Sequence, residues 1–79
     1  MNAESIEIVK VPGICGGRAT FKGTRSTIWH LIAELETGMT EEEYLTHFPH
    51  KTREHIRAAR EYYDRHQAEI RKDIAENGE

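Results

Sequence analysis

Cysteine, proline and long apolar runs are scarce in this sequence, and each scarcity excludes a class of protein. The 79 residues include one cysteine, Cys15, and two prolines, Pro12 and Pro49. A single cysteine cannot form an internal disulfide, which fits a reducing compartment. No segment approaches the ~20 apolar residues of a membrane span, and the N-terminal stretch carries Glu4 and Glu7 rather than a signal-peptide core. We therefore expect a cytoplasmic protein that does not associate with a membrane.

Motifs of catalysis and of metal or nucleotide binding are also missing. The glycines fit neither the Walker spacing nor the dinucleotide fingerprint. The run Glu41–Glu43 lies at the expected start of a helix, where it favours the helix dipole and needs no catalytic explanation. Because only Cys15 accompanies His47, His50 and His55, we interpret these histidines as surface residues rather than as a zinc site. We expect neither an enzyme nor a cofactor.

The chain is short, and its charge is unevenly distributed. Its length allows one domain that is marginally stable as a monomer, which favours a homodimer or a partner protein. The net charge of −3 gives no overall attraction to nucleic acid. Basic residues nevertheless outnumber acidic ones in residues 1–33 and 51–66, whereas residues 34–50 contain five glutamates and no lysine or arginine. If the two basic segments fold onto one face, that face can contact phosphates.

A short β element is predicted at the N-terminus. Residues 6–11 alternate between apolar and polar side chains over most of their length, as a half-buried strand does. Residues 18–22 read as a second short strand between turns at Gly16, Gly17 and Gly23, because glycine adopts positive φ at little steric cost. These turns and strands form an ordered, basic segment that leads into a helix.

Apolar residues at helical spacing predict three helices after the β element. The first begins at Ile28 after the capping residue Thr27 and ends before Gly38. The second follows Thr40, which forms a capping box with the glutamate three residues later, and it ends before Pro49.

The third helix is predicted to follow Thr52 and to run from Arg53 to about Ala75, because no glycine or proline interrupts it. Its length of roughly 35 Å exceeds the span of a compact domain, so its last turns are expected to protrude. We therefore divide the chain into a domain of residues 1–66 and a helical extension of residues 67–79. The residues expected to bind a partner are Ile70, Arg71, Lys72 and Ile74. A frayed acidic tail is the alternative.

The second and third predicted helices have the layout of a helix-turn-helix, in which the second of the two helices enters the major groove of DNA. The second helix is short, residues 47–51 form a tight turn, and basic residues begin the third helix. The residues expected to contact DNA are Lys51, Thr52, Arg53 and Arg57. Arg25 is a further candidate for a phosphate contact, or else it forms a structural salt bridge with an acidic residue of the second helix. Because Glu54 weakens the positive field, a protein–protein interaction module that binds no DNA is the alternative.

Four segments together resemble a widespread prokaryotic family. Residues 11–25 read Val-Pro-Gly-Ile-Cys-Gly-Gly-Arg-Ala-Thr-Phe-Lys-Gly-Thr-Arg, and residues 36–45 read Glu-Thr-Gly-Met-Thr-Glu-Glu-Glu-Tyr-Leu. Phe-Pro-His follows at residues 48–50 and Ile-Arg-Ala-Ala at residues 56–59. The chain resembles domain-of-unknown-function family four-three-three over roughly residues 6–63.

This resemblance implies a VapB-like antitoxin with a helix-turn-helix domain. Such an antitoxin neutralises a PIN-like ribonuclease toxin and binds operator DNA to regulate the operon that encodes both proteins. An orphan helix-turn-helix domain without a toxin is the alternative. The sequence departs from the family at Ala19 and Thr27, where the family usually has proline, and at Lys51, where it usually has leucine. The expected fold is therefore mainly α: a three-helix helix-turn-helix domain with a short N-terminal β element and an extended C-terminal helix.

Overall fold

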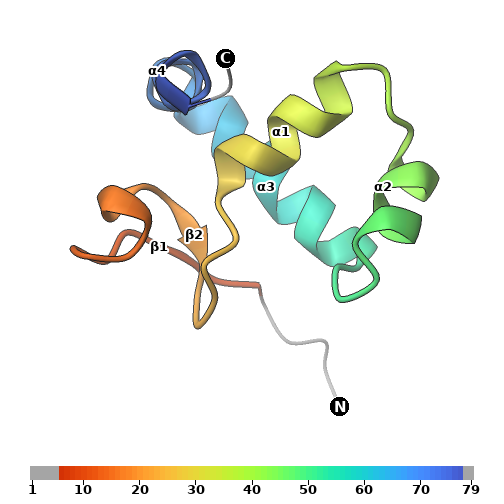
Figure 1. Cartoon of the computed structure of the whole chain (residues 1–79), viewed down its shortest axis with the longest axis horizontal. Helices are drawn as coiled ribbons and strands as arrows, with labels where there is room; N and C mark the ends of the chain where they lie inside the picture. Colours follow the sequence, from red (N-terminus) through yellow and green to blue (C-terminus); the bar gives the residue numbers. More distant parts are fainter. Residues whose placement is uncertain (1–5, 78–79) are drawn as a thin grey trace.

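The computed structural model describes residues 6–77 and shows a mainly helical chain with a two-stranded sheet. The elements in chain order are β1 (Ile8–Val9), the 3-10 turn η1 (Cys15–Gly17), β2 (Thr20–Phe21), α1 (Ile28–Glu36), α2 (Glu41–His47), α3 (Arg53–Arg65) and α4 (Gln67–Asn77) (Figure 1). The predicted segments 1–66 and 67–79 extend at their outer ends into residues 1–5 and 78–79, which lie outside the described residues.

The predicted β element is present, with shorter strands than the alternation of side chains indicated. β1 and β2 pair antiparallel, with Ile8 opposite Phe21. On its other side β2 contacts the chain that enters α1, because the Phe21 N–H donates to the Ser26 carbonyl at 3.0 Å and the Ile28 N–H donates to the Ala19 carbonyl at 3.0 Å. β2 is therefore held on both sides, and the residues that follow it form a tight turn.

The predicted boundaries of the first two helices are confirmed. At the start of α2 the Thr40 hydroxyl accepts from the Glu43 N–H at 3.1 Å, and the Glu43 carboxylate accepts from the Thr40 N–H at 2.9 Å. Gly38 follows α1 with φ +102°, a conformation that glycine adopts more readily than other residues. Thr27 occupies the N-cap position of α1, but its hydroxyl does not form the expected capping bond.

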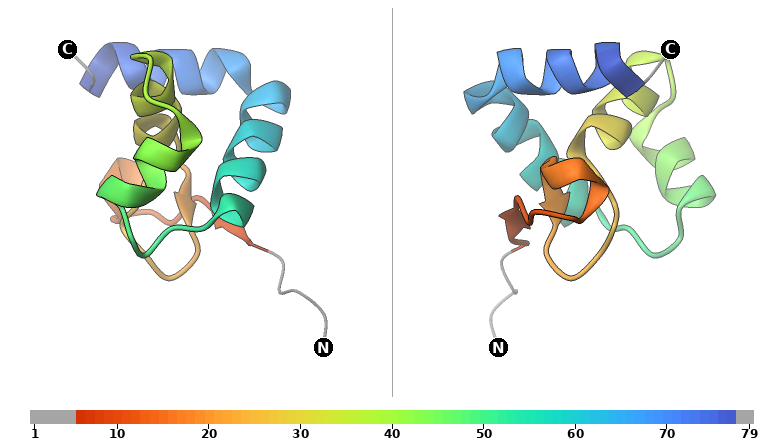
Figure 2. Two further views of the ribbon diagram at one scale, coloured as in Figure 1. Left: turned by 90° about the vertical axis from the view of Figure 1, so that its right-hand side faces the viewer. Right: turned by 60° about the vertical axis from the view of Figure 1, so that its left-hand side comes forward.

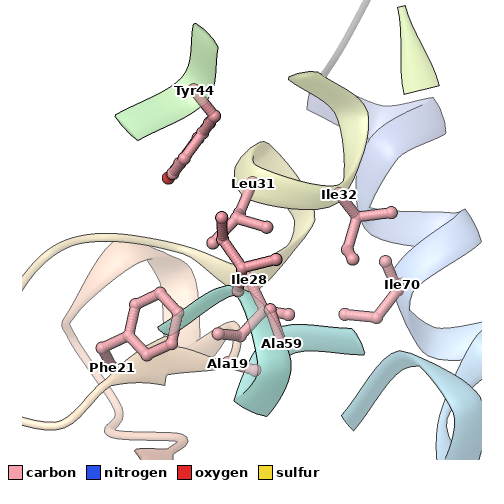
Figure 3. Packing of buried hydrophobic residues seen from close by; sticks show 9 residues of the cluster. Ala19, Phe21, Ile28, Leu31, Ile32, Tyr44, Ala59 and Ile70 are labelled. Atoms are coloured by element: carbon pink, nitrogen blue, oxygen red, sulfur yellow. The ribbon is translucent and has the colours of Figure 1, made fainter. Parts of the chain in front are cut away.

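One hydrophobic core joins the β element to all four helices (Figure 3). Its buried members are Ala19, Phe21, Ile28, Leu31, Ile32, Tyr44, Ile56, Ala59 and Ile70. Ile28, Ala59 and Ile70 are 0 % exposed. Burial of such aliphatic side chains is the main favourable term in folding a chain of this size.

The prediction of one long, protruding C-terminal helix is wrong. The helix breaks at His66, whose φ of −135° and ψ of 46° are not helical, and α4 folds back across α1 (Figure 2). The Tyr62 ring stacks on His66 with ring centroids 4.2 Å apart, and the Tyr62 hydroxyl donates to the Glu69 carboxylate at 2.9 Å. Folding back brings Ile70 into the core. Burial of this side chain favours the broken helix over a continuous helix in which Ile70 would be exposed.

Charged side chains hold α4 against the rest of the chain. Arg71 of α4 donates to Glu36 of α1 at 2.6 Å. Arg18, which follows η1, lies 3.2 Å from Glu76 and 3.6 Å from Asp73. A fourth pair, between Lys10 and Glu69 at 3.2 Å, ties the end of the first strand to the start of α4. The C-terminal helix is therefore an integral part of the domain.

Candidate nucleic-acid interface

The helices α2 and α3, which the sequence predicts as a helix-turn-helix pair, follow one another and are joined by a short turn. α2 ends at His47, and the carbonyl of the next residue, Phe48, accepts from the Lys51 N–H at 2.9 Å and closes the turn. Thr52 is the N-cap of α3, and its side chain is exposed. Residues 52–54 are exposed, so the start of α3 lies at the surface, where an anion is favoured by the helix dipole.

His55 holds the start of α3, a role that the sequence analysis did not assign. Its ring Nδ1 accepts from the Thr52 N–H at 3.1 Å, and the ring packs edge-on against Phe21 with centroids 4.9 Å apart. Burial lowers the pKa of His55 below 6.5, and the charge of Lys51 lowers it further. The sequence signal was Thr52-x-x-His55, a capping box in which histidine replaces the usual glutamate.

The turn between β2 and α1 lies at the same end of the molecule as the turn between α2 and α3, opposite α4 (Figures 1 and 2). Within the first turn the Thr24 hydroxyl donates to the Phe21 carbonyl at 2.8 Å and accepts from the Ser26 N–H at 3.0 Å. The Lys51 ammonium lies 5.9 Å from the centre of the Phe21 ring. The fold thus brings together the two basic segments of the sequence, which place Arg25 and Lys51 at one end.

The arginines predicted on α3 lie beside carboxylates. Arg53 is 3.2 Å from Glu41 and 3.9 Å from Glu42. Arg57 is 3.5 Å from Glu54, one turn earlier on the same helix. These three pairs are exposed, as is the pair of Arg60 with Glu41 at 3.3 Å, so each contributes little to stability and can be exchanged for another anion.

Arg25 and Lys51 differ from these arginines. No carboxylate among the described residues forms an ion pair with either side chain, and the alternative salt bridge between Arg25 and α2 is not observed there. The Arg25 side chain is exposed, whereas Lys51 is partly buried against Phe21. The positive charge of this end is therefore concentrated on the two turns rather than on the outer face of α3.

A shallow groove of about 490 Å³ lies between the Arg25 turn, the start of α1, the η1 turn and the end of α4. Its lining residues are Cys15, Arg18, Arg25, Ser26, Thr27, Trp29, His30, Phe48 and Asn77. Two arginines line the groove, and no acidic side chain of residues 6–77 does. Since Arg18 is engaged with acidic residues of α4, Arg25 is the cation that the groove offers to an anion.

The residues predicted to bind a partner do not form one surface. Ile70 is 0 % exposed, and Ile74 is partly buried against the core, so this apolar pair is not free to dock in this conformation. Arg71 is exposed but paired with Glu36, and Lys72 is exposed. The prediction assumed a protruding helix, whereas burial of Ile70 draws α4 onto the domain. Binding of a partner by these residues stays a prediction.

Within residues 6–77, no group of three or more histidine, cysteine or acidic side chains is placed to hold a metal ion.

Cys15 has φ +50°, and its thiol donates to the Arg25 carbonyl at 3.3 Å. None of the described helices combines the length and the apolar composition that crossing a membrane requires.

Comparisons with known proteins place the chain beside one family. The family model described as "Protein of unknown function (DUF433)" matches residues 8–63. The chain is similar to a DUF433 member protein from Anabaena variabilis ATCC 29413 whose crystal structure is known. The two sequences are 37% identical, and the two structures superpose with a TM-score of 0.81. The match covers 86% of this chain and 67% of that chain. No curated protein matches the sequence.

Proposed function

The chain belongs to the DUF433 family, and from this premise we propose that it is an antitoxin that binds operator DNA through its helix-turn-helix end. Its second activity in this proposal is the neutralisation of a PIN-like ribonuclease toxin encoded beside it. The observation that supports DNA binding best is the joint placement of Arg25 and Lys51 on two adjacent turns that lack an acidic partner among the described residues.

The proposed contacts divide into two kinds. Arg25, Lys51 and the N–H groups at the exposed start of α3 bind backbone phosphates, which positions the helix but reads no sequence. Arg53 and Arg57 then exchange their surface carboxylates for base edges or phosphates in the major groove. The exchange is feasible because both ion pairs are exposed to water.

A pure protein–protein interaction module remains the second candidate, and one observation favours it. The two arginines placed best for a major groove, Arg53 and Arg57, both lie beside glutamates. If these pairs persist, the outer face of α3 is electrically balanced and does not attract DNA. The DNA-binding protein and the interaction module therefore differ in which feature determines attraction to DNA: the unpaired cations of the two turns, or the electrically balanced outer face of α3.

A DNA-binding assay with a matched pair of variants separates these readings. We would measure fluorescence anisotropy on labelled DNA from upstream of the gene, over a range of salt concentrations. Lys51→Gln removes one positive charge from the proposed interface, and Lys72→Gln removes one from α4 at the opposite end. We expect Lys51→Gln to weaken binding about tenfold and to reduce the slope of log K against log salt by about 1, because one phosphate contact is lost. Equal effects of the two variants, or the absence of binding by the parent protein, would favour the interaction module.

The toxin part of the proposal rests on the family resemblance, and the fold limits which residues can serve it. In the observed conformation α4 offers Arg71 and Lys72 to a partner, whereas Ile70 is buried. Co-expression with the product of the adjacent gene, followed by affinity capture and light scattering, tests the association. A stable heteromeric complex supports the antitoxin, and a protein that purifies alone supports an orphan helix-turn-helix domain.

A further inference from the structure

A single residue separates α3 from α4. His66 alone leaves helical geometry, and residues 53–77 contain neither glycine nor proline. Its backbone remains almost in register, since the His66 N–H donates to the Tyr62 carbonyl at 2.9 Å and the Ile70 N–H donates to the His66 carbonyl at 3.0 Å. The break nevertheless removes helical partners from carbonyls at the end of α3 and from N–H groups at the start of α4. A rotation at one residue would restore them in a continuous helix.

The contacts that hold α4 are made with distant parts of the chain. Arg71 pairs with Glu36, and Arg18 pairs with Asp73 and Glu76, across 35, 55 and 58 positions of sequence respectively. None of these contacts depends on α4 being attached to the same copy of the chain.

The site that buries Ile70 can accept α4 from the same copy of the chain or from another copy. The residue packs in the core with Ile32 of α1 and other buried side chains (Figure 3). A second copy of the chain presents the same helix with the same charges at the same spacing. The surface that α4 covers therefore fits an α4 from another copy as well as its own.

We propose that α4 exchanges between two copies of the chain, with His66 as the hinge. In the exchanged dimer α3 and α4 form one continuous helix, and each α4 packs on α1 and the core of the other copy. The exchange keeps every long-range contact and restores helical hydrogen bonds at both junctions. It gives up the stacking of Tyr62 on His66 and the bond from Tyr62 to Glu69. This inference does not rest on the proposed function.

Protein concentration decides between the two forms. A helix on a short connection has an effective concentration in the millimolar range, so dilute protein closes on itself and concentrated protein exchanges. Because Ile70 is fully buried, opening a folded copy exposes the core. We therefore expect exchange to occur while the chain folds and to be slow afterwards.

The test uses the native chain and its ion pair between Lys10 and Glu69, whose charged atoms lie 3.2 Å apart. Unlabelled and ¹⁵N-labelled chains are unfolded together, refolded at millimolar concentration and separated by size. A zero-length carbodiimide then joins Lys10 to Glu69, and the linked peptides are analysed by mass spectrometry. We expect the dimer fraction to contain mixed-isotope peptides in the proportion of random pairing, and the monomer fraction to contain only same-isotope peptides. A failure to form dimers, or a dimer whose linked peptides are all same-isotope, overturns the proposal.

Two variants at the hinge sharpen the test. His66→Ala favours a continuous helix, whereas His66→Gly disfavours it, and the observed backbone angles of His66 suit either residue. Since both junctions of the dimer contribute, the dimerisation constant, [dimer]/[monomer]², should be on the order of thirtyfold higher for His66→Ala than for His66→Gly. Circular dichroism of the monomer fractions verifies that both variants fold. Equal constants in two folded variants would contradict a hinge at this residue.

Discussion

The two turns at the helix-turn-helix end and the two arginines at the α4 end use their positive charge in opposite ways. At the α4 end, Arg18 and Arg71 pair with carboxylates that lie far away in sequence, and these pairs hold the last helix on the domain. At the helix-turn-helix end, Arg25 and Lys51 have no acidic partner among the described residues. The comparison shows that the number of basic residues does not locate a binding surface, whereas the position of the acidic residues around them does.

Removal of the buried anchor of α4 should produce the largest effect. We expect Ile70→Ala to lower the free energy of unfolding by about 2–4 kcal/mol, because the side chain is 0 % exposed and its loss leaves a cavity. Ile74→Ala, at a partly buried position of the same helix, should cost clearly less. Urea unfolding monitored by circular dichroism measures both. A smaller cost for Ile70→Ala than for Ile74→Ala would show that α4 does not close the core.

Removal of an acidic residue from the helix-turn-helix end should leave an arginine of α3 without a carboxylate partner, as Arg25 and Lys51 already are among the described residues. Glu41 pairs with both Arg53 and Arg60, so Glu41→Gln releases Arg60 and leaves Arg53 only its longer pair with Glu42 at 3.9 Å. We expect DNA affinity to rise about threefold to tenfold, with little change in stability because these pairs are exposed. Glu36→Gln makes the same change of net charge at the α4 end and serves as the control in the anisotropy assay. An equal gain in both variants would mean that net charge alone sets affinity.

The pH dependence of stability should reveal His55 at the helix-turn-helix end. Because the pKa of His55 is lowered in the folded state, its contribution is present above 6.5 and is lost as pH falls through the folded value. His55→Gln keeps an acceptor for the Thr52 N–H but does not titrate there. The unfolding free energy of the parent protein should therefore fall relative to His55→Gln as pH decreases below neutrality. Parallel pH profiles for the two proteins would contradict the assignment of the cap.

At the α4 end, Asp73 should give a pH dependence of stability opposite in sign to that of His55. We expect this effect to be the smallest of the four. Burial raises the pKa of Asp73 above its ordinary value of 3.8, and the nearby Arg18 lowers it only in part. The corresponding stabilisation is complete below 3.8 and is lost as pH rises through the folded value. The stability of Asp73→Asn relative to the parent should therefore increase with pH across this window. Urea titrations at several acidic pH values test it, and a difference that decreases with pH would reverse the interpretation.

Local signals in the sequence predicted those parts of the fold that local contacts determine. The capping box of Thr40 and Glu43 and the glycine at position 38 marked the ends of helices correctly, because each acts within a few residues. The break at His66 carries no such signal. It results from the burial of Ile70 and from a pair between Arg71 and Glu36, which only the folded chain brings together.

The candidate site divides in the same way. The two helices α2 and α3 followed from the spacing of apolar residues and the proline at position 49. The pairing of Arg53 with Glu41 across α2 and α3 did not, since it depends on how the two helices cross. The meeting of the two basic turns likewise depends on a tertiary contact, the packing of His55 against Phe21.

That ring contact has an entropic consequence. Phe21 immediately precedes the turn that carries Arg25, and His55 caps the helix that follows Lys51, so one aromatic pair links the elements that carry the two turns. The placement of the two turns relative to each other is set during folding, and a ligand that contacts both does not have to order one turn against the other. Such preorganisation selects ligands by the distance between their negative charges before any individual contact is made.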